Sequence, residues 1–184
     1  MQFVGSMVSD QDGVNYRLDI IDTAGQEEYR DMLGSLFSVD SAIDAYLLVY
    51  DITSETSLQN LEYFDELIEK NLDAALQGPR KVSPVKIVAG NKCDLSEYRA
   101  ISSATGLAWA KARGCGFMET SAKGMVNIEE TFQTLIQQVA LNRQKNEQQQ
   151  FPPEFRGKPS LNGRNFGGDP NEKTTDKGGC CVIC

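Results

Sequence analysis

The sequence predicts an α/β protein whose doubly wound sheet is mostly parallel, and three observations lead to this fold class. Apolar runs alternate with helical patterns along residues 1–143, the order expected of strand–helix–strand units. The runs AYLLVYDI (45–52) and VKIVAG (85–90) are almost continuously apolar, as are parallel strands covered on both faces. Polar motifs follow the predicted strands, and ligands of such folds bind at those strand ends.

Two further strands are predicted on either side of these apolar runs. The segment YRLDIID (16–22) alternates apolar and polar residues, with Tyr16, Leu18 and Ile20 on one face. The segment GFMET (116–120) is a weaker candidate for the last strand of the domain.

Three helices are predicted between and after the strands. The first has an apolar stripe at helical spacing that one acidic residue interrupts: Leu58, Leu61, Asp65, Ile68 and Leu72. The second, over 103–113, is rich in alanine and stops at Gly114, a typical helix terminator. The third opens with Asn127 and Glu130 at the spacing of a capping box. Its apolar face consists of Ile128, Phe132, Leu135 and Val139.

Composition excludes several kinds of chemistry. The net charge of −8 argues against a nucleic-acid partner, because phosphate backbones are bound by clustered Lys and Arg. The chain has no histidine, so acid–base catalysis and metal sites that depend on histidine are excluded. The start, MQFVGSMVSD, has neither the basic segment nor the long apolar run of a signal peptide. The chain has 5 cysteines, an odd number. Together with the lack of a signal-peptide pattern, this count indicates a reduced, cytosolic chain rather than one held by disulfides.

The composition changes near Gln144, which predicts the domain organisation. Beyond this point the chain is rich in Gln, Gly and Asn and contains Pro152, Pro153, Pro159 and Pro170. Such a segment cannot bury enough apolar surface to offset the entropy lost on ordering it. We therefore expect a domain over 1–143, a flexible hypervariable linker over 144–179 and a C-terminal signal over 180–184.

The motif NKCD, which follows the run 85–90, suits a guanine base. The Asp94 carboxylate can accept two parallel hydrogen bonds, from the ring N–H and the exocyclic amino group of guanine. Adenine offers neither donor at that edge, so it would leave the buried carboxylate unpaired. Asn91 can brace the loop and meet the acceptor edge of the base, and the stem of Lys92 can lie on its face. Taken alone, these four letters also fit a simple polar turn.

The motif ETSAK, which follows the predicted strand 116–120, strengthens the guanine interpretation. A backbone N–H near Ala122 can donate to the guanine carbonyl oxygen, and Lys123 can cover the second face of the base. Ser121 belongs to the same loop and is a further candidate nucleotide-binding residue. Two motifs after successive strands predict a guanine site more specifically than either motif does alone.

A third motif, DTAGQEEY, lies at the end of the strand 16–22. Its candidate site residues are Asp22, Thr23, Ala24, Gly25 and Gln26. Alone, this pattern also fits an aspartate-capped turn that leads into an acidic helix start.

Together, LDIIDTAGQEEY, GNKCDL and ETSAK resemble a Ras-type small GTPase in order, spacing and strand context, over about residues 8–143 and the chain terminus. The resemblance implies a P-loop NTPase fold of the small-GTPase type, with GTP, GDP and Mg²⁺ as ligands and hydrolysis of GTP as the activity. It implies that Asp22 holds Mg²⁺ through water, that the Gly25 N–H approaches the terminal phosphate and that Gln26 orients the attacking water. It also implies exchange factors, GTPase-activating proteins and effectors as partners, and a mobile segment over 25–33 that exchange factors and effectors read.

The phosphate loop of that family, G-x-x-x-x-G-K-[ST], does not occur in this sequence. The segments GGDPNEKT (167–174) and RGKPS (156–160) are rejected, because Glu172 replaces a required glycine and Pro159 replaces a required hydroxyl. Against the family pattern, the first strand, the first helix and the first switch are missing.

In this fold, the missing strand sits in mid-sheet, between the strands that contain Ile20 and Leu48. Two buried strand edges should then be unpaired, and the chain alone should fold poorly. Two explanations stay open: an incomplete sequence, such as an incomplete gene model, which we favour, and a genuine short form that does not bind the triphosphate.

The C-terminus, GGCCVIC, fits the C-a-a-X pattern for prenylation. Cys181 is the predicted lipid acceptor, and farnesyl is favoured because the last residue is neither Leu nor Phe. One lipid anchors only weakly, so reversible palmitoylation of Cys180 is the expected second signal. These features predict attachment to the cytoplasmic face of the plasma membrane or to endomembranes.

Two functions from different classes remain in competition. The first is a membrane-anchored GTP/GDP switch that hydrolyses GTP. The second is a nucleotide-free pseudo-GTPase that acts only as an interaction module. Binding of fluorescent GTP, with and without Mg²⁺, distinguishes the two.

Overall fold

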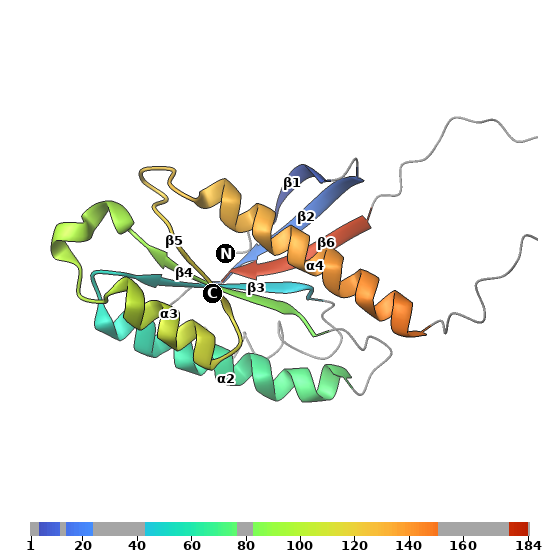
Figure 1. Ribbon diagram of the computed structural model, residues 1–184, viewed down its shortest axis with the longest axis horizontal. Coiled ribbons are helices and arrows are strands. Elements are labelled where there is room, and N and C mark those ends of the chain that lie inside the picture. Colours follow the sequence, from blue (N-terminus) through green and yellow to red (C-terminus); the bar gives the residue numbers. More distant parts are fainter. Residues whose placement is uncertain (1–3, 12–13, 24–42, 77–82, 151–176, 184) are drawn as a thin grey trace, which may run out of the picture.

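The computed structural model of the chain describes residues 4–11, 14–23, 43–76, 83–150 and 177–183 (Figure 1). Six strands form one sheet in the order β1-β2-β6-β3-β4-β5. Their bounds are β1 Val4–Gln11, β2 Val14–Asp22, β3 Ala45–Asp51, β4 Val85–Asn91, β5 Gly116–Glu119 and β6 Lys177–Ile183. Only β1 pairs antiparallel, with β2, and the other neighbours are parallel. The predicted fold class is confirmed.

The helices cover both faces of this sheet (Figure 1). The described helices are α2 Glu55–Leu76, α3 Ser103–Ala112 and α4 Ile128–Gln150, with the 3-10 helix η2 Cys93–Tyr98 after β4. No described helix is both long and apolar enough to cross a bilayer. Helices are the usual crossover connections between parallel strands. The alternation of strands and helices predicted from the sequence therefore agrees with the parallel sheet of the structure.

The side chains on the two sides of β3 pack into two separate hydrophobic clusters, because successive residues of a strand point to opposite sides. Tyr46, Leu48 and Tyr50 pack into the cluster shared with α2 and α3. Ala45 and Leu47 pack into the cluster shared with α4. Burial on both sides explains why β3 and β4 appear in the sequence as unbroken apolar runs.

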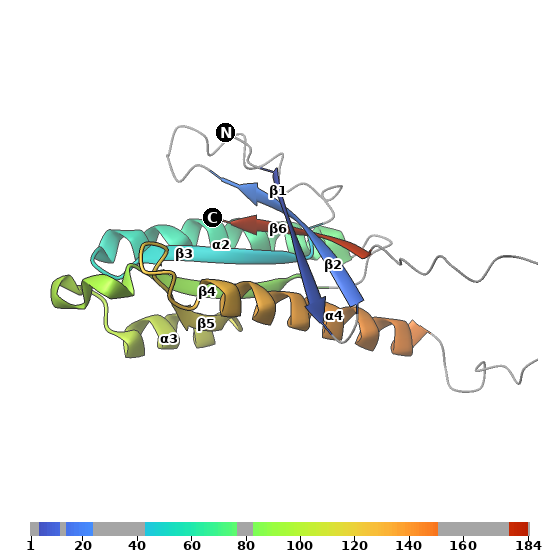
Figure 2. The same ribbon diagram turned by 90° about the horizontal axis from the view of Figure 1, so that it is seen from above.

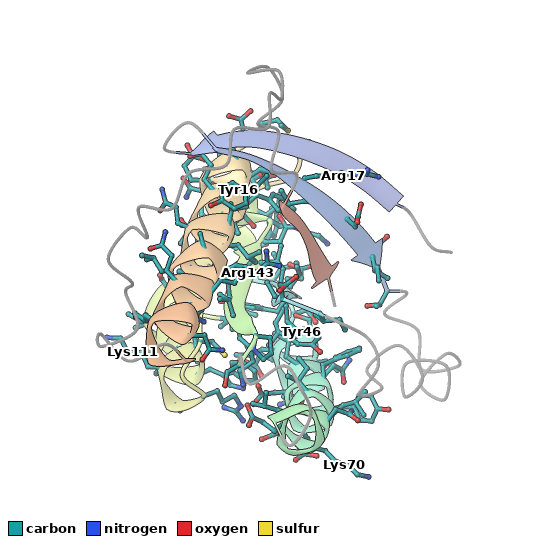
Figure 3. All side chains as sticks on the ribbon, turned by 90° about the vertical axis from the view of Figure 1, so that its right-hand side faces the viewer. Tyr16, Arg17, Tyr46, Lys70, Lys111 and Arg143 are labelled. Carbon is teal, nitrogen blue, oxygen red and sulfur yellow. The ribbon has the colours of Figure 1, made fainter. Side chains whose placement is uncertain are left out.

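The cluster under α4 extends to β2. Leu18 is buried there beside Leu135 and Ile136 of α4, and Tyr16 packs against the same group. Figure 3 shows the labelled Tyr16 beside this helix. These contacts fix β2 over α4 and carry its carboxyl end, Asp22, to the same edge of the sheet as the ends of β3 and β4.

The interior position between β2 and β3 is occupied by β6 (Figures 1 and 2). This is the place between Ile20 and Leu48 where the sequence predicts a missing strand and two unpaired edges. The expectation of unpaired edges is wrong for this structure, because residues from the C-terminal end of the chain pair with both neighbours. On this side, β2 thus finds backbone partners from Tyr16 to Asp22, and β3 finds them from Ala45 to Leu47.

The structure differs from the predicted domain boundaries at two places. Helix α4 continues to Gln150, beyond the expected end of the domain at 143. Residues such as Gln, Lys, Glu and Arg are good helix formers. Arg143 also forms an ion pair with Asp44 (2.8 Å), and the Asn142 amide donates to the Ser83 carbonyl at 3.5 Å. Arg143 is labelled in Figure 3. At the other end, 177–183 forms a strand where a linker and a free signal were expected.

The predicted helix termini are partly reproduced. Gly114 follows α3 with a φ of 66°, the left-handed conformation that favours glycine. Asn127 directly precedes α4, as predicted, but it does so with a φ of 55°. Its side-chain amide donates to the carbonyl of Glu119 at 2.8 Å, so Asn127 ties the helix start to β5.

Candidate guanine-nucleotide site

The motifs after β4 and β5 lie against one another at the carboxyl edge of the sheet. The Ala122 N–H donates to the Oδ1 atom of Asn91 at 3.1 Å. The Cys93 N–H donates to the carbonyl of Thr120 at 3.0 Å. Parallel pairing of β4 with β5 brings the two loops to the same edge, and these two bonds hold them together. The predicted bracing role of Asn91 is thus directed at the second loop.

Asp94 is exposed, whereas the sequence argument expects it to be buried, and only one of its oxygens is engaged within the described part of the chain. Its Oδ1 atom accepts a hydrogen bond from the Ser121 hydroxyl at 2.5 Å. Ser121 is 0% exposed, and its Oγ atom also accepts from the Gly124 N–H at 2.8 Å. Ser121, a predicted nucleotide-binding residue, thus orients the Asp94 carboxylate, which faces solvent. An oriented carboxylate loses less freedom when it binds a ligand.

Lys92 is held over the same edge by a residue that sequence reasoning did not single out. Its backbone is left-handed, with a φ of 66°, and its Nζ atom lies 2.6 Å from the Oδ2 atom of Asp51. The other oxygen of Asp51 accepts from the N–H and the hydroxyl of Thr53, at 2.8 and 2.7 Å. Burial alone would raise the pKa of Asp51, but these hydrogen bonds from Lys92 and Thr53 outweigh it and lower the pKa.

The loop that carries Ala122 and Lys123 is exposed, and both residues face solvent. Reciprocal backbone hydrogen bonds between Ser121 and Val126, each 3.0 Å, close the loop. Met125 adopts a φ of 54°, which few residues other than glycine tolerate. The loop is therefore a tight turn, and the N–H groups of Ala122, Gly124 and Val126 are bonded to Asn91 and Ser121 within the protein.

An ion pair beneath this loop is a second feature that the sequence did not indicate. The Arg99 guanidinium donates to both oxygens of Glu119, at 2.5 and 3.1 Å, and to the Ile101 carbonyl at 3.1 Å. Bidentate pairs of this kind combine energy with fixed geometry. Since Glu119 ends β5 and Arg99 follows η2, the pair links the two motif-bearing segments a second time.

Tyr50 contributes a buried hydroxyl under the site. The residue is 1% exposed, and its Oη atom has no hydrogen-bond partner among the described residues. Burial raises the pKa of this hydroxyl, and the Glu119 carboxylate raises it further, so the group stays neutral. A Cβ atom on Gly90 would lie 2.7 Å from the Oη atom, which explains a glycine there.

We predict that Tyr50→Phe leaves the free energy of unfolding unchanged or raises it by up to about 1 kcal/mol, because the change removes an unsatisfied buried hydroxyl. Urea denaturation followed through the fluorescence of Trp109, the single tryptophan, measures this. The control is Tyr98→Phe, which alters a tyrosine that is 72% exposed and should have no effect. A loss above about 1 kcal/mol in the first variant would contradict the assignment.

The predicted phosphate side is only partly described. Asp22 ends β2 as an exposed carboxylate, and Thr23 beside it is buried. Ala24, Gly25 and Gln26 lie outside the described residues. Groups of three or more potential metal ligands do not occur in the described ranges. Mg²⁺ in nucleotide sites is commonly held by one or two carboxylates with phosphate oxygens and water, and Asp22 fits that role.

Comparisons with known proteins agree with this geometry. The model of the Ras family matches residues 4–141. A "Ras-like protein" of Laccaria bicolor is 35% identical over 167 residues, which cover 91% of this chain and 71% of the relative. The "Ras-related protein Rab-8A" of Bos taurus is 36% identical over 134 residues, 73% of this chain and 59% of the relative. The chain belongs to the Ras family, a class of small GTPases, and this membership implies GTP hydrolysis by resemblance.

Proposed function

We propose that this chain binds GTP and GDP and works as a GTP-hydrolysing switch. The observation that carries the proposal is the base-binding edge formed by Asp94, Ser121, Asn91 and Ala122. These residues come from two loops and are already joined by hydrogen bonds of 2.5 and 3.1 Å. A preformed edge of this kind needs little reorganisation on binding.

The chemistry of this edge favours guanine over adenine. The Asp94 carboxylate keeps an exposed oxygen for the base, while its other oxygen is held by Ser121. Guanine presents two donors at the matching edge, and adenine presents none. A site built to accept those donors rejects a ligand that lacks them, because its own polar groups would be left unpaired.

The residues for hydrolysis follow from the family resemblance. Asp22 would hold Mg²⁺ through water, Gly25 would contact the terminal phosphate, and Gln26 would orient the attacking water. Mg²⁺, when bound, neutralises charge on the transferred phosphoryl group. Exchange factors, GTPase-activating proteins and effectors are the proposed partners, and an arginine from a partner would complete the site.

The proposed location is the cytoplasmic face of the plasma membrane or endomembranes. The support is the C-terminal pattern Cys181-Val182-Ile183-Cys184, with farnesyl on Cys181 and palmitate on Cys180. Two lipids give stable anchoring where one gives only reversible contact.

A second candidate is a nucleotide-free interaction module. One observation favours it: β6 occupies the interior sheet position that the family resemblance gives to the strand before the phosphate loop. The sequence KGGCCVI of β6 contains no phosphate-loop pattern.

Titration of the purified chain with fluorescent GTP, with and without Mg²⁺, tests the proposal. We expect saturable binding that unlabelled GTP and GDP displace and that ATP at the same concentration does not. Equal displacement by ATP would refute the assignment of Asp94. Absence of saturable binding would instead support the interaction module.

A further inference from the structure

Strand β6 holds a place that only one strand can occupy. It pairs in parallel with β2 along its whole length, from Tyr16↔Lys177 to Asp22↔Ile183. On its other side it pairs with β3 from Ala45↔Cys181 to Leu47↔Ile183. Figures 1 and 2 both place it between these two strands. An interior strand has neighbours on both sides, so its backbone cannot serve another partner at the same time.

The same residues carry the predicted lipidation sequence. Cys181 is paired with Ile20 on one side and with Ala45 on the other, and Cys180 is paired with Asp19. A transferase must take up the last residues of the chain in its own active site. Because Cys181, Val182 and Ile183 are paired with a strand on each side, they must leave the sheet before any transfer can occur.

We propose that sheet insertion of Lys177–Ile183 and lipid attachment at Cys181 exclude each other. A lipid transferase can then bind the C-terminal sequence only after β6 has left the sheet. This inference rests on the lipidation proposed above. The transfer itself is a displacement on an allylic prenyl diphosphate. The Cys181 thiol loses its proton, a C–S bond forms, the C–O bond to the diphosphate breaks, and diphosphate leaves.

Release of β6 is physically accessible for two reasons. Gly178 and Gly179 weaken a strand, since glycine adds entropy to the free chain and packs no side chain. Pairing with β3 covers only the last three residues of β6. Loss of these pairs would leave the pairing of β3 with β4 and of β4 with β5 intact.

The test uses the full chain and the variant Gly179→Pro. Proline cannot donate to the strand ladder, and Gly179 lies outside the last four residues, so the C-a-a-X pattern stays intact. Gly163→Pro, within 151–176, is the matched control. Iodoacetamide labelling of Cys180 and Cys181 is followed by mass spectrometry of the tryptic peptide that follows Lys177. The synthetic peptide KGGCCVIC gives the rate for the unstructured sequence.

We expect both cysteines to be labelled at least tenfold more slowly in the parent chain and in Gly163→Pro than in the peptide. Gly179→Pro should restore the peptide rate. Hydrogen exchange should then show lost protection in β2 and β3 but retained protection in β4. If the variant loses protection in β4 as well, the comparison of parent with peptide decides the question. Equal rates for parent and peptide would overturn the proposal.

Incubation with a purified farnesyltransferase and farnesyl diphosphate separates this inference from the lipidation that it assumes. Faster farnesyl incorporation into Gly179→Pro than into the parent supports exclusion. If Gly179→Pro exposes its thiols but accepts no farnesyl, lipidation at Cys181 is refuted while insertion stands. If the parent accepts farnesyl as fast as Gly179→Pro does, insertion of β6 does not slow lipid transfer and the proposal fails.

Discussion

Replacing Asp65 by alanine is expected to lower the free energy of unfolding by about 3–5 kcal/mol, since it leaves a buried ammonium without its buried partner. The Asp65 side chain, 10% exposed, lies 2.7 Å from the Nζ atom of Lys86, whose side chain is 9% exposed. Arg113 lies 3.3 Å from the other Asp65 oxygen. Burial alone would lower the pKa of Lys86, but hydrogen bonds to Asp65 and Glu69 outweigh it and raise the pKa.

The sign of this pKa shift decides the pH at which the measurement is made. A raised folded-state pKa means that Lys86 contributes stability that is complete at neutral pH and is lost as pH rises through that pKa. Urea denaturation at pH 7 therefore reports the charged pair in full. Trp109, which stacks 3.9 Å beneath the guanidinium of Arg113, is the fluorescence reporter of this region.

Two further variants show whether burial is the cause of the effect. Glu69→Ala removes the other partner of Lys86, at 2.5 Å, but the Glu69 side chain is 53% exposed. Its loss should cost at most about 1 kcal/mol. The double replacement Asp65→Leu with Lys86→Met removes both charges and should recover most of the stability lost in Asp65→Ala. If Asp65→Ala costs no more than Glu69→Ala, the buried ion pair is not a significant source of stability.

Replacing Asp94 by asparagine is expected to reduce GTP affinity roughly 100-fold or more. The amide presents one donor where the carboxylate presents an acceptor, so a donor of guanine meets a donor of the protein. The Asn oxygen can still accept from Ser121, which holds Asp94 at 2.5 Å, so the loop should keep its shape.

Xanthosine triphosphate provides a rescue that a merely destabilised loop would not show. Xanthine carries a carbonyl in place of the exocyclic amino group, and an asparagine amide matches that edge with one donor and one acceptor. Competition against fluorescent nucleotide should reverse the preference, with GTP favoured by the parent and xanthosine triphosphate by Asp94→Asn. Glu97→Gln, which removes an exposed charge from η2, is the matched control and should leave both affinities unchanged. Equal loss of both nucleotides in Asp94→Asn would refute base contact by this residue.

The sequence alone predicts those strands, loops and helix ends that are determined by interactions between residues close together in the chain. Strands β3 and β4 are recognisable because burial on both faces demands continuous apolar runs, and the observed bounds lie within one residue of 45–52 and 85–90. The candidate base-binding residues of the two loops could be placed at one edge because they directly follow neighbouring parallel strands. Gly114 is recognisable because a helix end that turns left-handed favours glycine.

Only the tertiary structure decided which distant residues become partners. Asp65 is visible in the sequence as an interruption of an apolar stripe, but its partner Lys86 is 21 residues away on another element. Asp51 and Lys92, 41 residues apart, meet because β3 and β4 are neighbours in the sheet. The place of 177–183 is the largest difference. Two glycines and a lipidation pattern indicate a free tail, whereas unpaired backbone groups on β2 and β3 favour any extended segment that can reach them.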